Sequence, residues 1–352
     1  MRGGEKVLEA LCEMYPDADI YTHVYDEKNI SNTIKCHNVF TTFISRLPLA
    51  KKLYKLYLPL MPIALELLDL THYDLIISSE SGPAKGIIPG PRAKHICYCH
   101  SPMRYIWDHY HLYQKSAGFF TKIMMPILSH YLRQWDTTSA TRTDLFVANS
   151  SHVANRVKKY YGRDAIVIHP PVAVELFNKV KETDISDFYL WAGELVAYKR
   201  PDILIDAFNQ SEKKLIVIGD GPEKKKLQAI SQKNISFLGK VDFSSLKWYF
   251  AHCKALIFPG EEDFGIIPVE VLASGRPVIA LSRGGILDIF GDQNLGKLFS
   301  DASVDSLQRA IREFERDSTH WGEVCVARAQ NFSKQKFCDE FSEVVREAIQ
   351  IR

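Results

Sequence analysis

Two glutamates stand on either side of a turn in PGEEDFGIIPVEVLASGRPVIA, residues 259–280, where Glu262 and Glu270 are eight positions apart. Between them lie Gly265, which can adopt backbone angles that other residues avoid, and Pro268, a residue favoured at the start of a helix. The backbone N–H groups at the start of such a helix have no partner within the helix. The pattern therefore predicts an anion-binding turn between a strand and a helix, flanked by two carboxylates.

The two carboxylates suit the two ends of a nucleotide ligand. Glu270, in the first turn of the expected helix, can accept hydrogen bonds from two vicinal hydroxyls such as those of a ribose. Glu262 would then face the other end of the same ligand, on the order of 10 Å away. This separation fits a diphosphate that joins a ribose to a sugar. The alternative is that Glu270 only caps its helix and that Glu262 is solvated.

A second candidate anion site lies in WAGELVAYKRP, residues 191–201. Gly193 ends an expected strand, and Lys199 and Arg200 come directly before Pro201, which suits the first position of a helix. Cations at this end oppose the helix dipole, which favours negative charge there. They are explained if a phosphate binds between the helix and Lys199. The alternative is a solvated basic turn.

The turn in LIVIGDGPEKKKL argues against one cofactor. Gly219 and Gly221 follow an apolar run and match the first two positions of the dinucleotide fingerprint GxGxxG, but its third position is Lys224. Without a glycine there, the helix lacks the close approach to the strand that the fingerprint provides. The sequence therefore does not support nicotinamide binding, and the glycine pair indicates either a tight turn or a ligand contact.

Apolar runs alternate with helical patterns along the chain and must position these residues. Strands are expected at 73–81, 93–100, 143–150 and 165–172, and then in DFYLWAGEL, KKLIVIGDGP, ISFLGKV, CKALIFPG and RPVIALS. Helices are expected at 201–211, 222–232, 243–252, 267–274, 303–317 and 334–350. This rhythm is typical of βαβ units with mostly parallel sheets. It predicts an α/β protein of two doubly wound, Rossmann-like domains that face a cleft.

The domain boundaries are expected where the rhythm is interrupted. The irregular stretch 169–186, which contains Pro170 and Pro171, indicates a linker. It would separate a first domain at 1–168 from a second domain at 187–332, with a last helix at 333–352 that crosses back to the first domain.

The chain opens in an unusual way, because Gly3 and Gly4 lead into a helical pattern without a strand before them. In an open α/β domain, a glycine-rich turn into the first helix normally follows a strand. Either the first strand of the domain is missing from the sheet, or the chain begins upstream of Met1. We favour the second, since loss of a central strand leaves its neighbours with unpaired backbone groups.

Composition excludes several classes of protein. The chain has 352 residues, 44 basic and 42 acidic, and a net charge of +2, which argues against a nucleic-acid partner. Its seven cysteines are scattered without a CxxC pair, as in a reduced cytoplasmic protein. We find neither a signal peptide nor an apolar run of membrane-spanning length. These features predict a cytoplasmic protein without a transmembrane segment.

Taken together, the ordered motifs resemble a known family over almost the whole chain. The spaced glutamates around Phe264-Gly265, together with GELVAYKRPDILIDAF, IGDGPE and GRPVIALSRGG, resemble the retaining GT-B glycosyltransferases of family 4. Further motifs are similar to the branch with bacterial O-antigen and polysaccharide mannosyltransferases, namely MRGGEKVLEALCE, YCHSPMRYIWD, YLRQWD, VANSSHVANRVKKYYGRDA and IHPPV.

The resemblance implies a role for each matching residue. Donor-binding residues would be Gly3, Gly4, Gly193, Lys199, Arg200, Phe264, Gly265, Ile266 and Glu270. Among them, Glu270 would hold the ribose and Lys199 the diphosphate. The catalytic residues would be His100, at the end of a first-domain strand, and Glu262, which would contact the transferred sugar. For His100 the alternative is a buried histidine whose hydrogen bonds are satisfied by the backbone.

One position departs from the family pattern. Many relatives carry an arginine where this chain has Glu194. Binding of the diphosphate would therefore depend more on Lys199, or on Arg200 as a substitute for the missing arginine. The resemblance also implies catalysis without a metal or a cofactor, because cations and helix dipoles stabilise the departing diphosphate. Asp108, His109 and His111 offer metal-binding groups, but further ligands are not evident in the sequence.

The resemblance leads to a specific expectation: transfer of mannose from GDP-mannose to a lipid-linked or polysaccharide acceptor, which the first domain would bind. Residues 47–70 mix lysines with apolar and aromatic residues, and they indicate either a peripheral contact with the inner face of the cytoplasmic membrane or a core helix with lysines at its edge. The rival functions are a sugar-nucleotide epimerase of the same architecture and a non-catalytic sugar-nucleotide-binding subunit.

Overall fold

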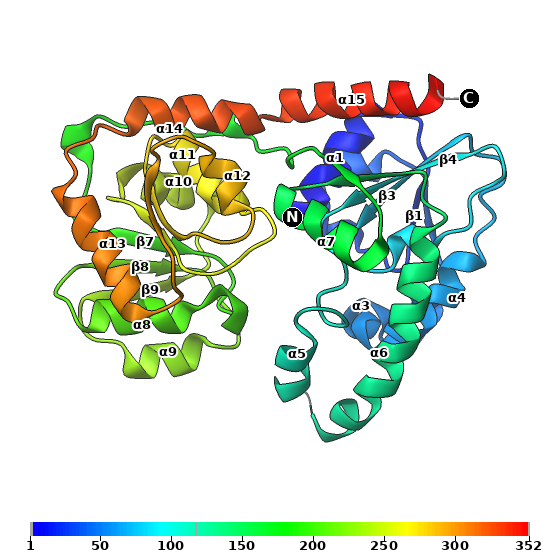
Figure 1. Ribbon diagram of the computed structural model, residues 1–352, viewed down its shortest axis with the longest axis horizontal. Coiled ribbons are helices and arrows are strands. Elements are labelled where there is room, and N and C mark those ends of the chain that lie inside the picture. The colour runs from blue at the N-terminus through cyan, green and yellow to red at the C-terminus, as the bar shows by residue number, and fades with distance from the viewer. Residues whose placement is uncertain (1–2, 117, 351–352) are drawn as a thin grey trace. The chain divides into compact units, whose positions relative to one another are not determined.

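The computed structural model describes residues 3–116 and 118–350, and the chain forms two compact units (Figure 1). The first unit comprises Met1–Pro170 together with Phe337–Arg352, and the second comprises Pro171–Lys336. The chain therefore passes from one unit to the other within the expected linker, and passes back near the start of its last helix.

The second unit is built on one parallel sheet of six strands. These are β7 (Tyr189–Ala192), β8 (Leu215–Ile218), β9 (Ile235–Gly239), β10 (Leu256–Phe258), β11 (Val278–Leu281) and β12 (Gly296–Phe299). Their order in the sheet is β12-β11-β10-β7-β8-β9. All residues of β7, β10 and β11 are buried, as expected for parallel strands that are covered on both faces.

Seven helices among the described residues of this unit connect or follow the strands. They are α8 (Pro201–Asn209), α9 (Lys224–Ile230), α10 (Phe243–His252), α11 (Ile266–Ala273), α12 (Ile286–Phe290), α13 (Val304–Arg316) and α14 (Gly322–Ala329). Amphipathic spacing explains how they pack: α13 buries Leu307, Ala310, Ile311 and Phe314, one face of the helix, against the sheet.

The first unit contains a parallel sheet in the order β3-β4-β5-β6 and a separate parallel pair, β1-β2. The strands are β1 (Ile20–Thr22), β2 (Val39–Thr41), β3 (Leu75–Glu80), β4 (Lys94–Cys99), β5 (Leu145–Ala148) and β6 (Ala165–Val167). Within residues 3–116 and 118–350 no strand precedes α1 (Gly3–Met14), and β3 pairs only with β4. A strand ahead of Gly3 stays a prediction.

Helices from both ends of the sequence complete the core of the first unit. Val7 of α1 and Phe341 and Val344 of α15 (Lys334–Gln350) belong to one buried cluster with Tyr98 of β4. The helix α7 (Ser151–Tyr161) contributes Val153 to a second cluster. Its N-cap is Ser150, whose side chain accepts a hydrogen bond from the N–H of Val153. These helices hold the carboxyl ends of β4 and β5 in place.

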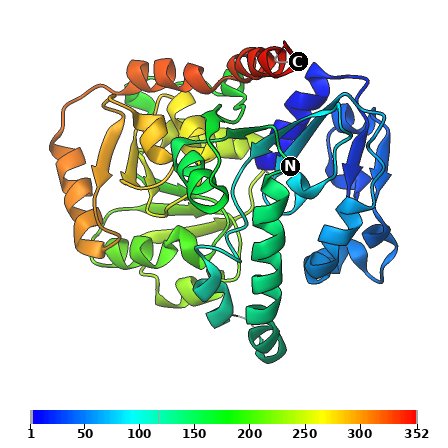
Figure 2. The ribbon, with the colours of Figure 1, turned by 45° about the vertical axis from the view of Figure 1, so that its right-hand side comes forward.

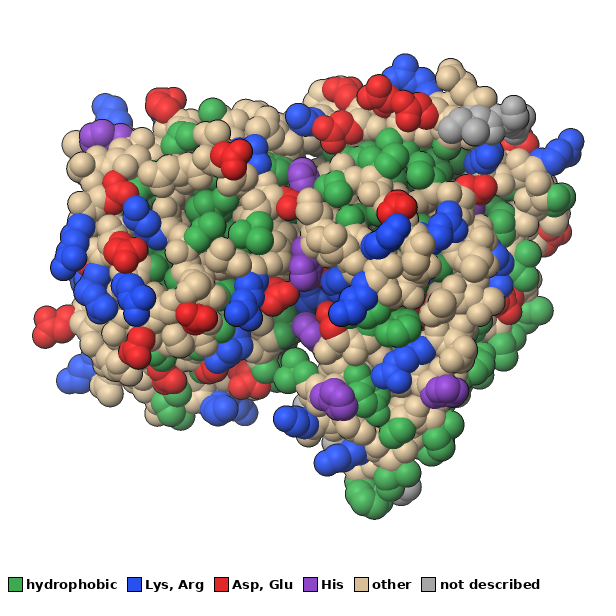
Figure 3. Space-filling model, in the orientation of Figure 1, with side chains coloured by type: hydrophobic (Ala, Val, Ile, Leu, Met, Phe, Trp, Pro, Cys, Tyr) green, Lys and Arg blue, Asp and Glu red, His purple; other side chains and the backbone are tan. Residues whose placement is uncertain are grey.

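A long helix, α6 (Phe119–Ala140), extends from the first unit (Figures 1 and 2). Its second half packs inside the unit, whereas residues 119–128 contribute no buried residue among those described. Hydrophobic and basic side chains gather on the surface at that tip (Figure 3). The neighbouring segment is broken into α3 (Ala50–Leu53), η3 (Tyr54–Leu60) and α4 (Met61–Glu66), as the prolines in it predict.

Candidate functional site

The carboxyl ends of β7 and β10 form the topological switch point of the second unit. These strands are neighbours, and the chain proceeds from them to opposite sides of the sheet order. In open α/β sheets, ligands bind outside the carboxyl ends of strands at such a point. β7 leads into η7 (Ala197–Lys199), and β10 leads into the turn before α11. The sheet order thus brings together the two stretches that the sequence singled out.

Lys199 and Glu262 meet at this point. The Nζ atom of Lys199 lies 2.9 Å from Oε1 of Glu262, and the two side chains are only 13% and 20% exposed. Burial works against the charged ammonium, but the Glu262 carboxylate, with Tyr198 and Glu194 nearby, raises the pKa of Lys199 above its ordinary value. Lys199 is therefore a permanent cation at the switch point.

Three glycines that the sequence left without a role allow this pairing. A Cβ on Gly260 would lie 2.6 Å from Cα of Lys199, so only glycine lets the two loops approach. Gly284 has φ +78°, and a Cβ there would collide with the carbonyl oxygen of Glu262. The N–H of Gly285 donates to that same oxygen at 2.9 Å. The adjacent glycines in the sequence SRGG could have indicated this close contact between loops.

The helix α11 begins earlier than the sequence suggested. Gly265 (φ +99°) is its N-cap and Ile266 its first residue, so Pro268 is the third residue and not the first. The left-handed conformation of Gly265 lets the helix begin at once, and Pro268 still falls in the first turn, where its missing N–H costs nothing. Glu270 therefore lies in the second turn and is 7% exposed. Phe264 is buried against Phe332.

Gly193 and Arg200 are the first and last residues of the loop between β7 and α8, and they contact different groups. A Cβ on Gly193 would lie 3.4 Å from Nζ of Lys199, so Gly193 belongs to the group around the ion pair. The guanidinium of Arg200 instead donates to both carboxylate oxygens of Asp202, at 3.0 and 2.9 Å. The structure thus pairs Arg200 with its own helix and leaves Lys199 as the cation beside Glu262.

The glycine pair after β8 has a packing role. A Cβ on Gly219 would collide with the carbonyl oxygen of Gly193, and one on Gly221 would lie 2.5 Å from the carbonyl oxygen of Leu195. Both glycines therefore allow the turn after β8 to contact the loop after β7. This close approach of two loops explains the GxG pattern without a dinucleotide.

His100 follows β4 in the first unit and is held by its neighbours there. Its Nε2 atom lies 2.8 Å from the hydroxyl of Ser79, at the end of β3. Its backbone oxygen accepts a hydrogen bond of 3.0 Å from the side-chain amide of Asn149. A Cβ on Gly4 would lie 3.5 Å from Nε2 of His100, so the start of α1 passes next to the imidazole. Gly4 and His100 thus meet at one edge of this unit, and Gly3 is the first residue of the same helix.

A buried charged cluster lies directly beside Ser79. Glu80 accepts hydrogen bonds from the backbone N–H of Lys85, at 2.6 Å, and from its ammonium, at 3.0 Å. The ammonium also pairs with Asp136 of α6, which accepts from the indole N–H of Trp107. Glu80, Lys85 and Asp136 have no exposed surface. Burial raises the pKa of Glu80 to about 7, although the Lys85 ammonium opposes this.

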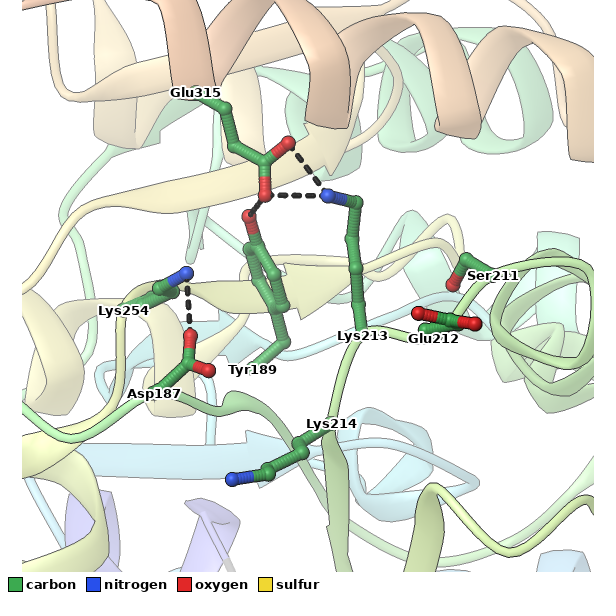
Figure 4. Close-up of a pocket in the computed structure, with 8 residues that line it drawn as sticks. All are labelled: Asp187, Tyr189, Ser211, Glu212, Lys213, Lys214, Lys254 and Glu315. Atoms are coloured by element: carbon green, nitrogen blue, oxygen red, sulfur yellow. Dashed lines mark hydrogen bonds and ion pairs between the residues drawn. The ribbon is translucent and has the colours of Figure 1, made fainter.

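The second unit also has a cavity of about 480 Å³ away from the switch point (Figure 4). Tyr189, the first residue of β7, lines it together with residues that precede β8, so it lies at the amino ends of these strands. Four of its charged side chains form two ion pairs, Lys254 with Asp187 at 2.6 Å and Lys213 with Glu315 at 2.6 Å. Such internal neutralisation makes it a poor site for a diphosphate.

The described residues form neither a candidate metal cluster nor a membrane-spanning helix. Within residues 3–116 and 118–350, no three His, Cys, Asp or Glu side chains are grouped so that they could hold a metal ion. Asp108 instead pairs with Arg156 at 2.8 Å. In the same part of the chain, none of the helices combines the length and the apolar character needed to cross a bilayer.

Each half of the chain matches a known family of glycosyltransferases. Residues 1–176 match the family described as Glycosyltransferase Family 4, and residues 174–335 match the family of Glycosyl transferases group 1. An uncharacterized glycosyltransferase of Methanocaldococcus jannaschii is 32% identical over 180 residues, which is 50% of each chain.

Two relatives have more specific names. The O-antigen chain mannosyltransferase C of Escherichia coli is 25% identical over 57% of this chain and 58% of its own. A GDP-mannose-dependent alpha-mannosyltransferase of Corynebacterium glutamicum is 30% identical over 39% of this chain and 33% of its own. The matches span about a third to somewhat over half the length of these curated relatives.

Solved structures share the fold. Sucrose-phosphate synthase of Thermosynechococcus elongatus has a TM-score of 0.72 at 16% identity, over 98% of this chain and 92% of its own. Anabaena HepE, solved with UDP-glucose, has a TM-score of 0.70 at 18% identity, over 99% of this chain and 96% of its own. These likenesses confirm the predicted α/β fold class of GT-B glycosyltransferases. With the match of its first half to the family 4 model, the chain belongs to the family 4 glycosyltransferases.

Proposed function

We propose that the protein is a retaining hexosyltransferase that moves mannose from GDP-mannose to a lipid-linked or polysaccharide acceptor. The observation that carries the proposal is the ion pair between Lys199 and Glu262 at the switch point of the second unit. A nucleoside diphosphate leaving group develops negative charge, and a preorganised cation beside a helix N-terminus stabilises that charge. The name of the Corynebacterium relative supports GDP-mannose as the donor.

In this proposal the second unit binds the donor. Lys199 and the N-terminus of α11 contact the diphosphate, Glu270 accepts hydrogen bonds from the ribose hydroxyls, and Glu262 with the backbone around Gly265 contacts the transferred sugar. The burial of Glu270 suits a carboxylate that receives hydrogen bonds from a ligand.

The first unit supplies His100 and the acceptor. His100 contacts the donor sugar, and the start of α1 at Gly3 and Gly4 lies near the diphosphate. No cofactor or metal takes part. The lipid-linked acceptor would place the reaction at the inner face of the cytoplasmic membrane. The name of the Escherichia coli relative, an O-antigen chain mannosyltransferase, supports an acceptor of this kind.

Thermal unfolding in the presence of different donors tests the choice of nucleotide. GDP-mannose should raise the melting temperature more than UDP-glucose or ADP-glucose, because a ligand that binds only the folded state stabilises it. The UDP-glucose complex of HepE makes a uracil donor the relevant competitor. A larger shift with UDP-glucose would overturn the proposed donor.

Product analysis separates the proposal from its two rivals. An epimerase would release a changed sugar nucleotide without an acceptor, so incubation with GDP-mannose alone should give no new sugar nucleotide. A non-catalytic subunit would neither hydrolyse nor transfer the sugar. We expect transfer that is lost in Glu262→Ala and in His100→Ala, while binding of GDP remains.

A further inference from the structure

Two stretches of the first unit combine basic and apolar side chains without a single acidic one. Neither residues 43–65 nor residues 109–135 contain Asp or Glu, although the chain has 42 of them. Their basic residues are Arg46, Lys51, Lys52, Lys55, Lys115, Lys122 and Arg133. A solvated surface in a chain of net charge +2 would be expected to mix both signs. This composition therefore needs an explanation of its own.

The helix α6 turns an apolar stripe toward the surface. Phe119, Ile123 and Ile127 recur at four-residue spacing, which places them on one side of a helix, and they are 74%, 54% and 65% exposed. Met124 and Tyr131 extend the exposed stripe. A helix on the surface of a globular protein normally turns such a stripe inward. Here the described side chains of residues 119–128 are exposed or only partly buried.

The segment from α3 to α4 exposes a second set of apolar residues. Leu49, Leu56 and Leu67 are 66%, 68% and 70% exposed, and Leu53, Leu60 and Ile63 are also exposed. Lys51, Lys52 and Lys55 are exposed between them. Lys51 makes a long contact of 3.9 Å with Asp26, between side chains that are both well exposed.

The two sets lie on neighbouring elements. Leu58 of η3 packs against a buried cluster that contains Leu132 of α6, and Trp135 of α6 donates a hydrogen bond of 2.8 Å to Glu66 of α4. Figures 1 and 2 both show α6 beside the segment from α3 to α4. We call the exposed side chains of residues 49–67 and 119–131 together the basic apolar face.

We propose that the basic apolar face docks into the interfacial region of a bilayer with anionic lipids. Apolar side chains enter the acyl boundary while lysines contact the negative headgroups, which is how amphipathic helices bind membranes. A second copy of the chain fits less well, because a symmetric contact would place the lysines of both copies together. The biological reason for such docking rests on the proposed function, because a lipid-linked acceptor lies in a membrane.

Vesicle sedimentation of the full chain tests this directly and needs no catalysis. The probes are vesicles of phosphatidylcholine alone and of equal parts of phosphatidylcholine and phosphatidylglycerol. We expect the protein to sediment with the anionic vesicles, less at high salt, and much less with the neutral ones. Binding that is absent with anionic vesicles would overturn the inference, while donor binding in solution would still report on the proposed function.

Two sets of substitutions locate the surface. K51E/K52E/K55E should lower the partition into anionic vesicles about 100-fold, and F119S/I123S/I127S should lower it by at least about ten-fold. The matched controls change the second unit: K225E/K226E/K233E for charge and I230S/L238S/L287S for exposed apolar surface. They should bind as the wild type does. Unchanged melting temperatures for the two face variants show that they fold.

Two results would contradict the assignment. Wild-type binding by both face variants would show that another surface docks. A stable dimer of the wild type that F119S/I123S/I127S converts to a monomer would show that a second copy covers α6 instead. Sedimentation equilibrium without lipid distinguishes this second case, for which we expect a monomer in the wild type.

Discussion

The ammonium of Lys199 lies 2.9 Å from the carboxylate of Glu262, so a cation that would bind a diphosphate is paired with the acid that would contact the sugar. Any diphosphate that binds Lys199 must compete with Glu262 for it. The two residues therefore oppose each other in nucleotide binding and cooperate only in transfer.

This relationship predicts opposite effects of two substitutions on the binding of GDP, which has no sugar. Lys199→Met should weaken GDP binding at least about ten-fold, because the diphosphate loses a charged partner. Glu262→Gln should tighten it about three-fold, because Lys199 loses its competitor, and should lower transfer about 100-fold. Calorimetry with GDP measures the first two effects, with Lys213→Met as a matched control. Equal weakening by both substitutions would refute the competition.

Glu194 should weaken the donor site through its charge. It is exposed, and it is among the carboxylates that raise the pKa of Lys199. Replacing it by arginine reverses one charge near the diphosphate, so Glu194→Arg should tighten GDP binding on the order of five-fold at low salt. The gain should shrink as salt screens it. Glu194→Gln should give a smaller gain, and no change in either variant would show that residue 194 lies outside the site.

Ser79 should act on transfer through His100. Its hydroxyl lies 2.8 Å from Nε2 of the imidazole and fixes the orientation of the ring. Ser79→Ala should lower kcat about ten-fold and change its pH dependence. GDP affinity should stay unchanged, because the side chains proposed to bind the ribose and the diphosphate, Glu270 and Lys199, belong to the second unit. Ser79→Thr keeps the hydroxyl and should restore most of the activity. A fall in melting temperature that accounts for the loss would indicate a structural role instead.

The buried Glu80 should make stability depend on pH. Its pKa is raised from 4.5 to about 7, so the folded state holds the proton more tightly than the unfolded chain. The contribution of Glu80 to stability is then complete below pH 4.5 and is lost as the pH rises through 7. It amounts to roughly 3 kcal/mol at most. Urea unfolding between pH 4.5 and 8 should show this slope in the wild type and a smaller one in Glu80→Gln. Glu313→Gln, on an exposed position of α13, should retain it.

The repeated apolar runs made the strands and most helices predictable. The strands from β3 to β11 fall within the runs identified in the sequence, and α10 has the predicted bounds. The short strand β2 (VFT) carries no such signal, because none of its three residues is buried. The start of α11 was misplaced by attention to Pro268, since the positive φ of Gly265 governs where that helix begins.

The parts of the site that depend on the sheet order could not be predicted. Gly284 is 22 positions from Glu262, and only the positions of β10 and β11 bring its backbone against that residue. Lys85 is also unremarkable in the sequence. It is buried because Asp136, on a distant helix, and Glu80 both face its ammonium. Contacts between loops and between distant charges follow from topology, and the local pattern does not encode topology.

The helix α15 has a consequence for biosynthesis. Phe337, Phe341 and Val344 complete a hydrophobic cluster that begins with Val7, whereas the second unit is continuous in sequence. During translation, the second unit can therefore finish folding while the first still exposes apolar surface. The half that is synthesised first would be the last to mature, and it would depend longest on chaperones.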